Sequence, residues 1–260
     1  MRTDPSSSAP PSDSVLFLFA HQDDEFGVLH QIEREVKSGA SVYCAYTTSG
    51  VRPGANPKQR NAESRHVLET LAVDPKRILF QGETLDIPDG QALQHIGTLR
   101  TWLNTWTLHH QTLRALYIPA WEGGHPDHDV LHAVAVQVIQ NGRLRSNVWQ
   151  YPLYNSNGLK WGFFKVLTPL AMNGAVLRQS IPWPGRWRHL RLCLNYRSQA
   201  KSWLGLYPFV LWHYLFKGWQ SLQQTSNTRL MERPHPGQLY YEFRGFSEWE
   251  KVFSHLQKEL

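Results

Sequence analysis

The chain of 260 residues contains only two cysteines, Cys44 and Cys193. Two thiols are too few for a disulfide framework or a thiolate zinc site, so we expect each to fill a gap in the core. Long apolar runs are also missing near the start, where Val15–Ala20 is too short for the apolar part of a secretory signal. We therefore expect a cytoplasmic protein without a disulfide scaffold.

Acidic side chains are fewer than basic ones, 21 against 27, which gives a formal net charge of +6. This balance favours an anionic partner such as a phosphorylated substrate, an acidic lipid or a nucleic acid. Arg186–Arg191 (RWRHLR) is a basic cluster, but no nucleic-acid-binding motif accompanies it. We therefore interpret the cluster as a solvated basic face and expect no nucleic-acid partner.

The hydrophobic fraction of 41% suffices for one substantial core. Residues 1–14 are rich in proline and serine and predict a flexible tail, whereas 15–260 predict a single domain. From 15 to 151, β-rich runs alternate with helical periodicity, which is typical of βαβ units. The expected strands are Val15–Ala20, Ser41–Thr47, Arg77–Gln81, Ala115–Pro119 and Asn147–Tyr151, and the expected helices are Glu25–Lys37, Lys58–Leu71, Ala92–Leu108 and Asp129–Gln140. This order predicts an α/β fold with a Rossmann-like, mostly parallel sheet and helices on both faces.

The alternation fades in residues 152–260, and eight of the eleven tryptophans lie at or after Trp149. We expect this region to be an aromatic-rich elaboration that packs on the sheet and frames its cleft. Within it, Trp203–Trp219 has apolar side chains on every helical face, but it is short and interrupted for a membrane span. Two interpretations stay open: a core element that lines the cleft, or an interfacial segment in peripheral contact with an anionic membrane.

Two polar clusters follow strand ends. His21–Glu25 (HQDDE) comes directly after the first expected strand, and Glu122–Asp129 (EGGHPDHD) follows the fourth. Each alone could be a helix start, since carboxylates favour that end of a helix. In a doubly wound sheet, however, ligands bind beyond the carboxyl ends of the strands. Because no G-x-G-x-x-G follows the first strand, the sequence does not predict a dehydrogenase.

The same clusters contain a donor set for a catalytic metal. Zinc in enzymes takes three protein ligands from histidine and carboxylate and leaves a fourth position for water. His21, Asp24 and His128 can supply such a set. The sequence therefore predicts a Zn²⁺ site that draws on both strand ends.

These residues resemble a known family, the PIG-L/LmbE-like zinc-dependent de-N-acetylases, whose pattern is AHPDDE followed farther along the chain by HPDH. The matching segments are Ala20–Glu25 (AHQDDE) and His125–His128 (HPDH), and Gln22 stands where the family usually has proline. Other segments also agree with the family, over a region from about residue 15 to residue 200: Thr47–Gly50 (TTSG), Arg60 with Glu63, and Tyr196–Gln199 (YRSQ).

The resemblance implies roles for the residues of the first cluster. His21 and Asp24, with His128, would bind Zn²⁺, and Asp23 would be the general base. A zinc-activated water would attack the carbonyl of an N-acyl, most commonly N-acetyl, amide while Asp23 accepts its proton.

Three further residues are candidates for roles in the same reaction. His125, in its protonated form, could stabilise the oxyanion or protonate the leaving amine. Asp127 would orient a histidine and favour its charged form. Arg60 is expected to bind phosphate or hydroxyl groups of the substrate, with an exposed arginine on an amphipathic helix as the alternative.

The expected substrate is an amino sugar or glycoconjugate, with phosphorylated and lipid-linked forms included. One alternative is metal-dependent hydrolysis of another ester or a phosphoester, although two-metal phosphoesterases need more bridging carboxylates. The other is a non-catalytic relative that binds carbohydrate or lipid. The presence of all three ligand candidates and of a base argues against that second alternative.

Overall fold

The computed structural model describes residues 13–110, 113–142, 147–160, 162–225 and 227–260. Most of the expected tail, residues 1–12, lies outside the described residues, and Ser14 already belongs to the first strand. The division of 15–260 into a core and an elaboration stays a prediction.

A seven-stranded sheet with the order β3-β2-β1-β4-β5-β9-β8 forms the centre of the fold. The first five strands in this order are parallel to one another, and β9 and β8 continue the sheet in antiparallel fashion. The strand bounds are β1 (Ser14–Phe19), β2 (Ser41–Tyr46), β3 (Ile78–Phe80), β4 (Leu113–Pro119), β5 (Asn147–Tyr151), β8 (Val176–Ser180) and β9 (Trp219–Gln224), and β6 (Tyr154–Asn155) pairs with β7 (Lys165–Val166) in a separate small sheet. The predicted α/β class with a mostly parallel sheet is confirmed.

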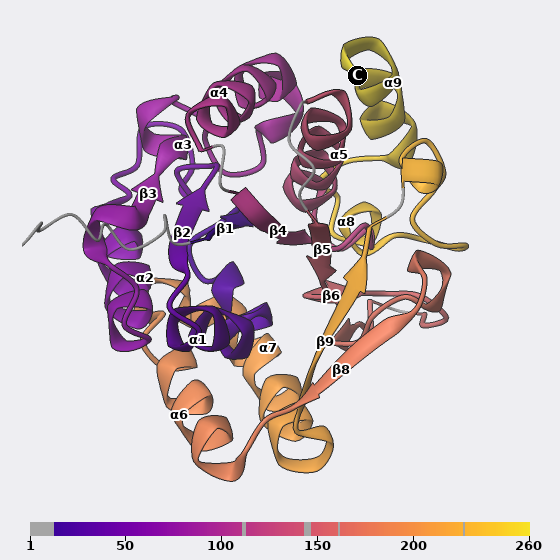
Figure 1. Cartoon of the computed structure of the whole chain (residues 1–260). Helices are drawn as coiled ribbons and strands as arrows, with labels where there is room; N and C mark the ends of the chain where they lie inside the picture. Colours follow the sequence, from indigo (N-terminus) through magenta and orange to yellow (C-terminus); the bar gives the residue numbers. More distant parts are fainter. Residues whose placement is uncertain (1–12, 111–112, 143–146, 161, 226) are drawn as a thin grey trace, which may run out of the picture.

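Helices cover both faces of this sheet. Figure 1 shows α4, α5 and α9 on one side and α1, α6 and α7 on the other. The helix bounds are α1 (Leu29–Lys37), α2 (Lys58–Thr70), α3 (Gln81–Thr84), α4 (Ile96–His109), α5 (Pro126–Asn141), α6 (Trp183–Cys193), α7 (Ala200–Trp212), α8 (Tyr240–Phe243) and α9 (Trp249–Glu259). Along β1, Phe17 and Phe19 belong to one apolar cluster and Leu16 and Leu18 to the other, because successive strand side chains point to opposite faces.

Three helices begin at other residues than the sequence predicts. The expected helix Ala92–Leu108 is split into a 3-10 helix, η3 (Ala92–His95), and α4. The expected helix Glu25–Lys37 is split into a 3-10 helix, η1 (Asp24–Gly27), and α1. The chain must first turn sharply at Asp23, whose φ is 119°, before regular helix can form. The expected helix Asp129–Gln140 begins three residues earlier, at Pro126, because proline fits the first position of a helix.

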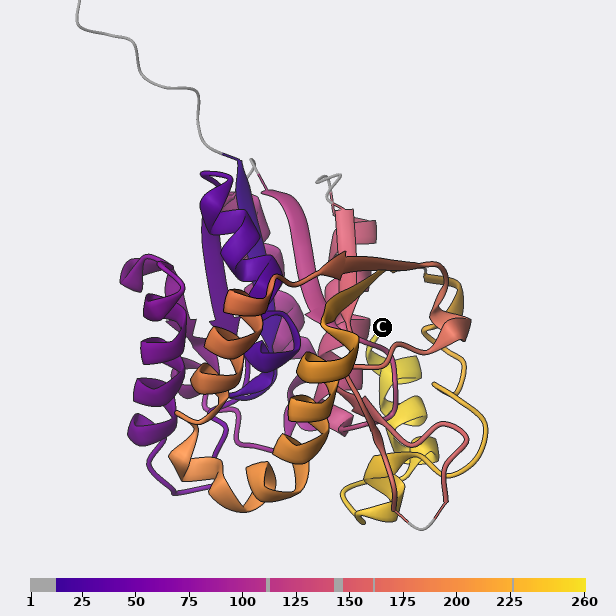
Figure 2. The same ribbon diagram turned by 90° about the horizontal axis from the view of Figure 1, so that it is seen from below.

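The aromatic-rich region does more than pack on the sheet. Its strands β9 and β8 extend the sheet beyond β5, and Figure 2 shows α6 and α7 side by side in front of it. Residues 203–219 form most of α7 and the π-helix His213–Lys217. Trp203 and Val210 are buried, but Leu204 is 81% exposed and Trp212 57% exposed. The core interpretation of 203–219 therefore holds for only part of the segment. Among the described helices, none combines the length and apolar character needed to cross a bilayer.

Candidate metal and active site

His21, Asp24 and His128 meet at the carboxyl ends of β1 and β4. His128 Nε2 lies 3.1 Å from Asp24 Oδ1 and 3.2 Å from His21 Nδ1, and His21 Nδ1 lies 3.6 Å from Asp24 Oδ2. All three side chains are buried. The sheet thus brings His21 and Asp24 together with His128, which lies more than one hundred positions later in the sequence.

The spacing of these three atoms fits a zinc ion. Ligands held at about 2.0–2.2 Å in a tetrahedron lie about 3.3–3.6 Å apart, close to the distances between the donor atoms here. Asp127 Oδ2 lies 3.0 Å from His21 Nε2 and favours a proton on that nitrogen, so Nδ1 would be the atom that binds a metal. A histidine oriented by a carboxylate in this way is a recurrent feature of metal sites.

Asp127 is itself held firmly. Its carboxylate accepts backbone N–H groups from Gly90 at 2.7 Å and from Ala92 at 3.0 Å. Burial raises the pKa of Asp127, but the hydrogen bond from His21 and the nearby charges of His125 and His21 together outweigh it and keep the pKa below the usual value. The residue that orients a histidine is therefore Asp127, and the histidine is His21.

Asp89 is a site residue that the sequence analysis missed. Its Oδ1 lies 3.1 Å from His21 Nε2, and its Oδ2 lies 3.9 Å from Arg60 Nη1. It belongs to a second group of possible metal donors, together with His21, His125 and Asp127. The only local signal is an Asp-Gly turn, Asp89-Gly90, between α3 and the next helical segment, and such turns are common in loops without function.

Asp23 lies beside the cluster, and its carboxylate accepts hydrogen bonds from two residues outside the cluster. Trp203 Nε1 donates to its Oδ2 at 3.0 Å, and Arg60 Nη2 donates to its Oδ1 at 3.3 Å. Burial raises the pKa of Asp23 to about 6, against the opposing effect of Arg60. A carboxylate with this pKa can hold and release a proton near neutral pH, as a general base must.

His125 caps the start of α5. Its Nδ1 accepts the Asp127 N–H at 3.2 Å, so the ring proton of the neutral form is on Nε2. Burial and the neighbouring His21 lower the pKa of His125 to about 4. This favours a neutral ring over the protonated form expected from the sequence. A neutral imidazole can still donate a hydrogen bond from Nε2 to a developing negative oxygen.

Arg60 is buried and holds the loop of the first cluster. Its Nη1 donates to the Gly50 carbonyl and its Nη2 donates to the Gln22 carbonyl at 2.7 Å. Gly50 has φ +66°, and a Cβ there would lie 1.8 Å from Gln22 Oε1, so this turn requires glycine. Arg60 also lines the pocket described below, and its role in binding substrate stays a prediction.

Gln22, where the family usually has proline, is integrated into this loop by its side chain. Its buried amide donates to Asn61 Oδ1 at 2.7 Å and to the Ser49 carbonyl at 3.2 Å. The hydrogen bonds of glutamine thus tie the loop to α2, where proline would restrict the backbone instead.

Replacing Gln22 by alanine is expected to lower the free energy of unfolding by about 1–3 kcal/mol, because Asn61 Oδ1 and the Ser49 carbonyl lose a buried donor. Urea denaturation measures this loss. Gln59→Ala is the matched control, since exposed Gln59 donates only to Glu63 on the same helix, and its effect should stay within about 0.5 kcal/mol. Equal effects of the two substitutions would contradict the structural role of Gln22.

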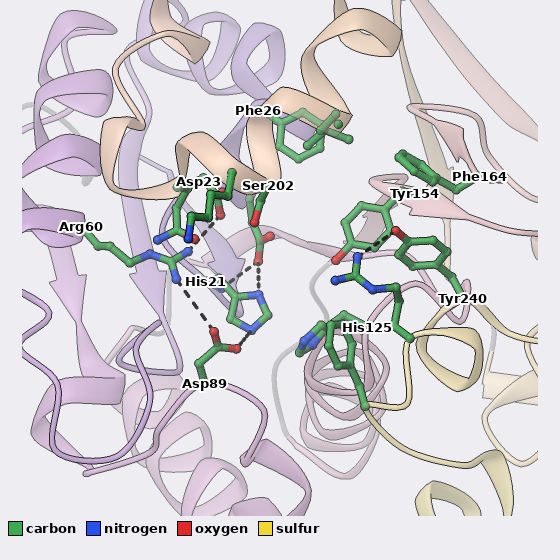
Figure 3. A pocket seen from close by; sticks show the side chains of 17 residues that line it. His21, Asp23, Phe26, Arg60, Asp89, His125, Tyr154, Phe164, Ser202 and Tyr240 are labelled. Atoms are coloured by element: carbon green, nitrogen blue, oxygen red, sulfur yellow. Dashed lines mark hydrogen bonds and ion pairs between the residues drawn. The ribbon is translucent and has the colours of Figure 1, made fainter. Parts of the chain in front are cut away.

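A pocket of about 390 Å³ opens onto these residues. In Figure 3, one side of His21 is occupied by Asp23, Arg60 and Asp89. The other side is occupied by His125, Tyr154 and Tyr240. Its lining combines polar site residues with aromatic and apolar ones: His21, Asp23, Asp24, Arg60, Asp89, His125, Phe26, Tyr154, Phe164, Gln199, Lys201, Ser202, Gly205, Leu206, Tyr240, Arg244 and Phe246. Residues after 152 such as Tyr154 and Tyr240 thus belong to the lining, although the sequence did not single them out.

Another His/Glu group lies between α1 and α6, formed by His30, Glu33 and His189. The Glu33 carboxylate already accepts hydrogen bonds from Lys37 and His189 and pairs with Arg188. Because Lys37 and Arg188 already place two positive charges at the Glu33 carboxylate, binding of a metal cation there is disfavoured. The group at β1 and β4 is thus the better metal site.

A known family and several solved structures are similar to this chain. The family described as PIG-L: GlcNAc-PI de-N-acetylase matches residues 16–139. No curated protein matches the chain significantly. Three solved structures share the fold over nearly their whole length, at identities that establish the fold alone.

A zinc-inhibited form of teicoplanin deacetylase Orf2 aligns with a TM-score of 0.61 and 12% identity, over 83% of this chain and 99% of that one. N,N'-diacetylchitobiose deacetylase from Pyrococcus horikoshii aligns with a TM-score of 0.62 and 15% identity, over 82% and 84%. GalB, a 4-carboxy-2-hydroxymuconate hydratase from Pseudomonas putida KT2440, aligns with a TM-score of 0.54 and 10% identity, over 83% and 96%. The fold thus occurs with more than one chemistry.

Proposed function

Since this chain belongs to the PIG-L (LmbE-like) family of de-N-acetylases, we propose that it hydrolyses the N-acetyl amide of an amino sugar or glycoconjugate with the help of a bound Zn²⁺. The observation that carries this proposal is the convergence of His21 Nδ1, Asp24 and His128 Nε2 beside a further carboxylate, that of Asp23. A ligand set and a base of this kind suit amide hydrolysis.

Each residue around the proposed metal would have a different role in the reaction. A zinc ion held by His21, Asp24 and His128 would polarise the amide carbonyl and lower the pKa of a bound water. Asp23, whose carboxylate is oriented by Trp203 and Arg60, would accept the proton of the attacking water and return it to the amide nitrogen as the C–N bond breaks and the amine leaves. His125 would donate a hydrogen bond to the oxygen that becomes negative. Asp127 would keep His21 in the tautomer that leaves Nδ1 free.

Other buried carboxylates serve the scaffold. Glu122 accepts backbone N–H groups of Leu153 at 2.6 Å and Tyr154 at 2.9 Å, and it thereby fixes the pocket wall that carries Tyr154. Asp129 accepts the N–H groups of Glu122 and Gly123, each at 3.2 Å. These contacts satisfy the loop after β4 internally, which leaves His125 and His128 to face the site.

A hydratase or phosphoesterase is the competing function, because related folds carry other chemistry. Two-metal phosphoester hydrolysis needs a second ion about 3.5–4 Å from the first, and the second group of possible donors in the described residues consists of Asp89, His125 and Asp127 with His21, which it shares with the first. Asp127 already accepts two backbone N–H groups and His21. A single metal and amide hydrolysis are therefore favoured.

The direct test is release of acetate from N-acetylated sugars by the zinc-loaded protein. A panel of N-acetylglucosamine, N,N'-diacetylchitobiose and N-acetylglucosaminyl phosphatidylinositol covers soluble and lipid-linked forms. Acetate should appear with at least one of them, stop when a chelator removes the metal, and return on adding Zn²⁺. Phosphate release without acetate release would favour the phosphoesterase instead.

A further inference from the structure

Three segments far apart in the sequence meet at the mouth of the pocket. They are residues 160 and 162–164, residues 201–209 and residues 243–246, which we call the pocket rim; residue 161 lies outside the described residues. Each contributes a side chain or backbone to the pocket lining, for example Phe164, Leu206 and Phe246. The ring centroids of Phe164 and Phe209 lie 5.2 Å apart, and Gly162 packs so closely on Phe243 that a Cβ there would lie 2.2 Å from its ring.

The same three segments also expose large apolar side chains to solvent. Leu204 is 81% exposed and Phe163 63%, and Phe209, Phe243 and Phe246 are each more than two fifths exposed. Single exposed apolar residues are ordinary, but a group around one opening marks an interaction surface. In Figure 2 the start of α7 lies at the lower edge of the molecule. The parallel strands point toward this edge, so their carboxyl ends, and the site with them, lie there too.

Charge on the rim is of one sign. The segments read KWGFF, KSWLGLYPF and FRGF, so each carries one cation and none carries an acid. Lys160, Lys201 and Arg244 are exposed, and within the described part of the chain none of the three forms an ion pair. Aromatic and leucine side chains interleaved with unpaired cations are the composition that binds the interface of an anionic bilayer.

We propose that the pocket rim docks on the surface of an anionic lipid bilayer, so that the pocket opens against the headgroups. Phe163, Leu204 and Phe243 would enter the boundary between headgroups and acyl chains, while Lys160, Lys201 and Arg244 meet the anionic phosphates. Charge complementarity selects this partner over a second copy of the chain, because two rims would bring six cations together without an acid to pair them.

Sedimentation of the full chain with vesicles tests this directly. Vesicles of phosphatidylcholine with phosphatidylglycerol should carry the protein down at low salt, and added salt or removal of the phosphatidylglycerol should weaken binding. Lys160→Ala should reduce partitioning about fivefold, the effect expected for one cation near the surface. Phe163→Ser combined with Leu204→Ser should reduce it by at least about tenfold.

Matched controls locate the effect. Leu108→Ser removes a side chain that is 64% exposed on α4, on the opposite side of the sheet, and Lys76→Ala removes an exposed cation far from the rim. Both should bind vesicles like the wild type, and circular dichroism establishes that each variant is folded.

Several outcomes would overturn the proposal. They are wild-type protein that stays in the supernatant with anionic vesicles at low salt, binding that the rim variants do not weaken, or a dimer that Leu204→Ser dissociates while vesicles bind nothing. None of these measurements depends on catalysis, so failure here leaves the deacetylase proposal to its own test.

Discussion

Asp23→Asn is expected to lower kcat by roughly 10²–10⁴-fold while the protein keeps its zinc, because an amide cannot accept the proton that the carboxylate takes. Asparagine is the right replacement on structural grounds. It has nearly the same shape, its carbonyl can still accept from Trp203 Nε1, and it tolerates the positive φ of 119° at this position better than alanine does. The substitution thus removes the base with little change to the loop.

Steady-state acetate release and elemental analysis of the same preparation measure the two parts of this prediction. Asn61→Ala is a useful control, since Asn61 holds the same loop through Gln22 but touches neither the cluster nor the pocket. It should lower stability more than kcat. Loss of zinc in Asp23→Asn would make Asp23 a ligand and move the base role to another residue.

His128→Ala is expected to abolish stoichiometric zinc binding and, with it, acetate release. His128 Nε2 contacts both Asp24 and His21, so its removal leaves two ligands, fewer than the three that catalytic zinc sites use. Elemental analysis of the purified, folded variant gives the metal content per chain.

The matched control lies one turn later on α5. His132 is equally buried, but its Nδ1–H donates to the Pro119 carbonyl at 2.8 Å, and it belongs to none of the metal-donor groups in the described residues. His132→Ala should lose stability and keep its zinc. Similar zinc content in the wild type and in His128→Ala would rule out the assigned ligand set.

The parallel core could be predicted because each of its strands and helices has a recognisable pattern within its own stretch of sequence. Strands such as Ser41–Tyr46 are largely apolar runs bounded by turns, and the helices between them show regular periodicity, so each predicted element of the core is found, with ends that differ by up to four residues. The antiparallel strands β8 and β9 gave no such signal. β9 (WQSLQQ) is largely polar, and its antiparallel pairing with β5 and β8 depends on partners distant in the sequence.

The site residues also fall into two groups, those that the sequence predicted and those that it did not. His21, Asp24 and His128 could be proposed together because each cluster follows a strand, and parallel strands end at one edge of the sheet. Asp89 and Trp203 could not, since Asp89 reaches His21 from a loop and Trp203 reaches Asp23 from a helix of the elaboration. Their positions depend on how α3 and α7 pack, which no local pattern encodes.

The most direct test of the metal site is diffraction from crystals of the zinc-loaded protein, measured on both sides of the zinc absorption edge. One anomalous peak is predicted, in contact with His21 Nδ1, Asp24 and His128 Nε2 and with the Asp23 carboxylate beside it. A peak at His30, Glu33 and His189 instead, or a second peak of equal height at Asp89 and Asp127, would contradict a single-zinc deacetylase.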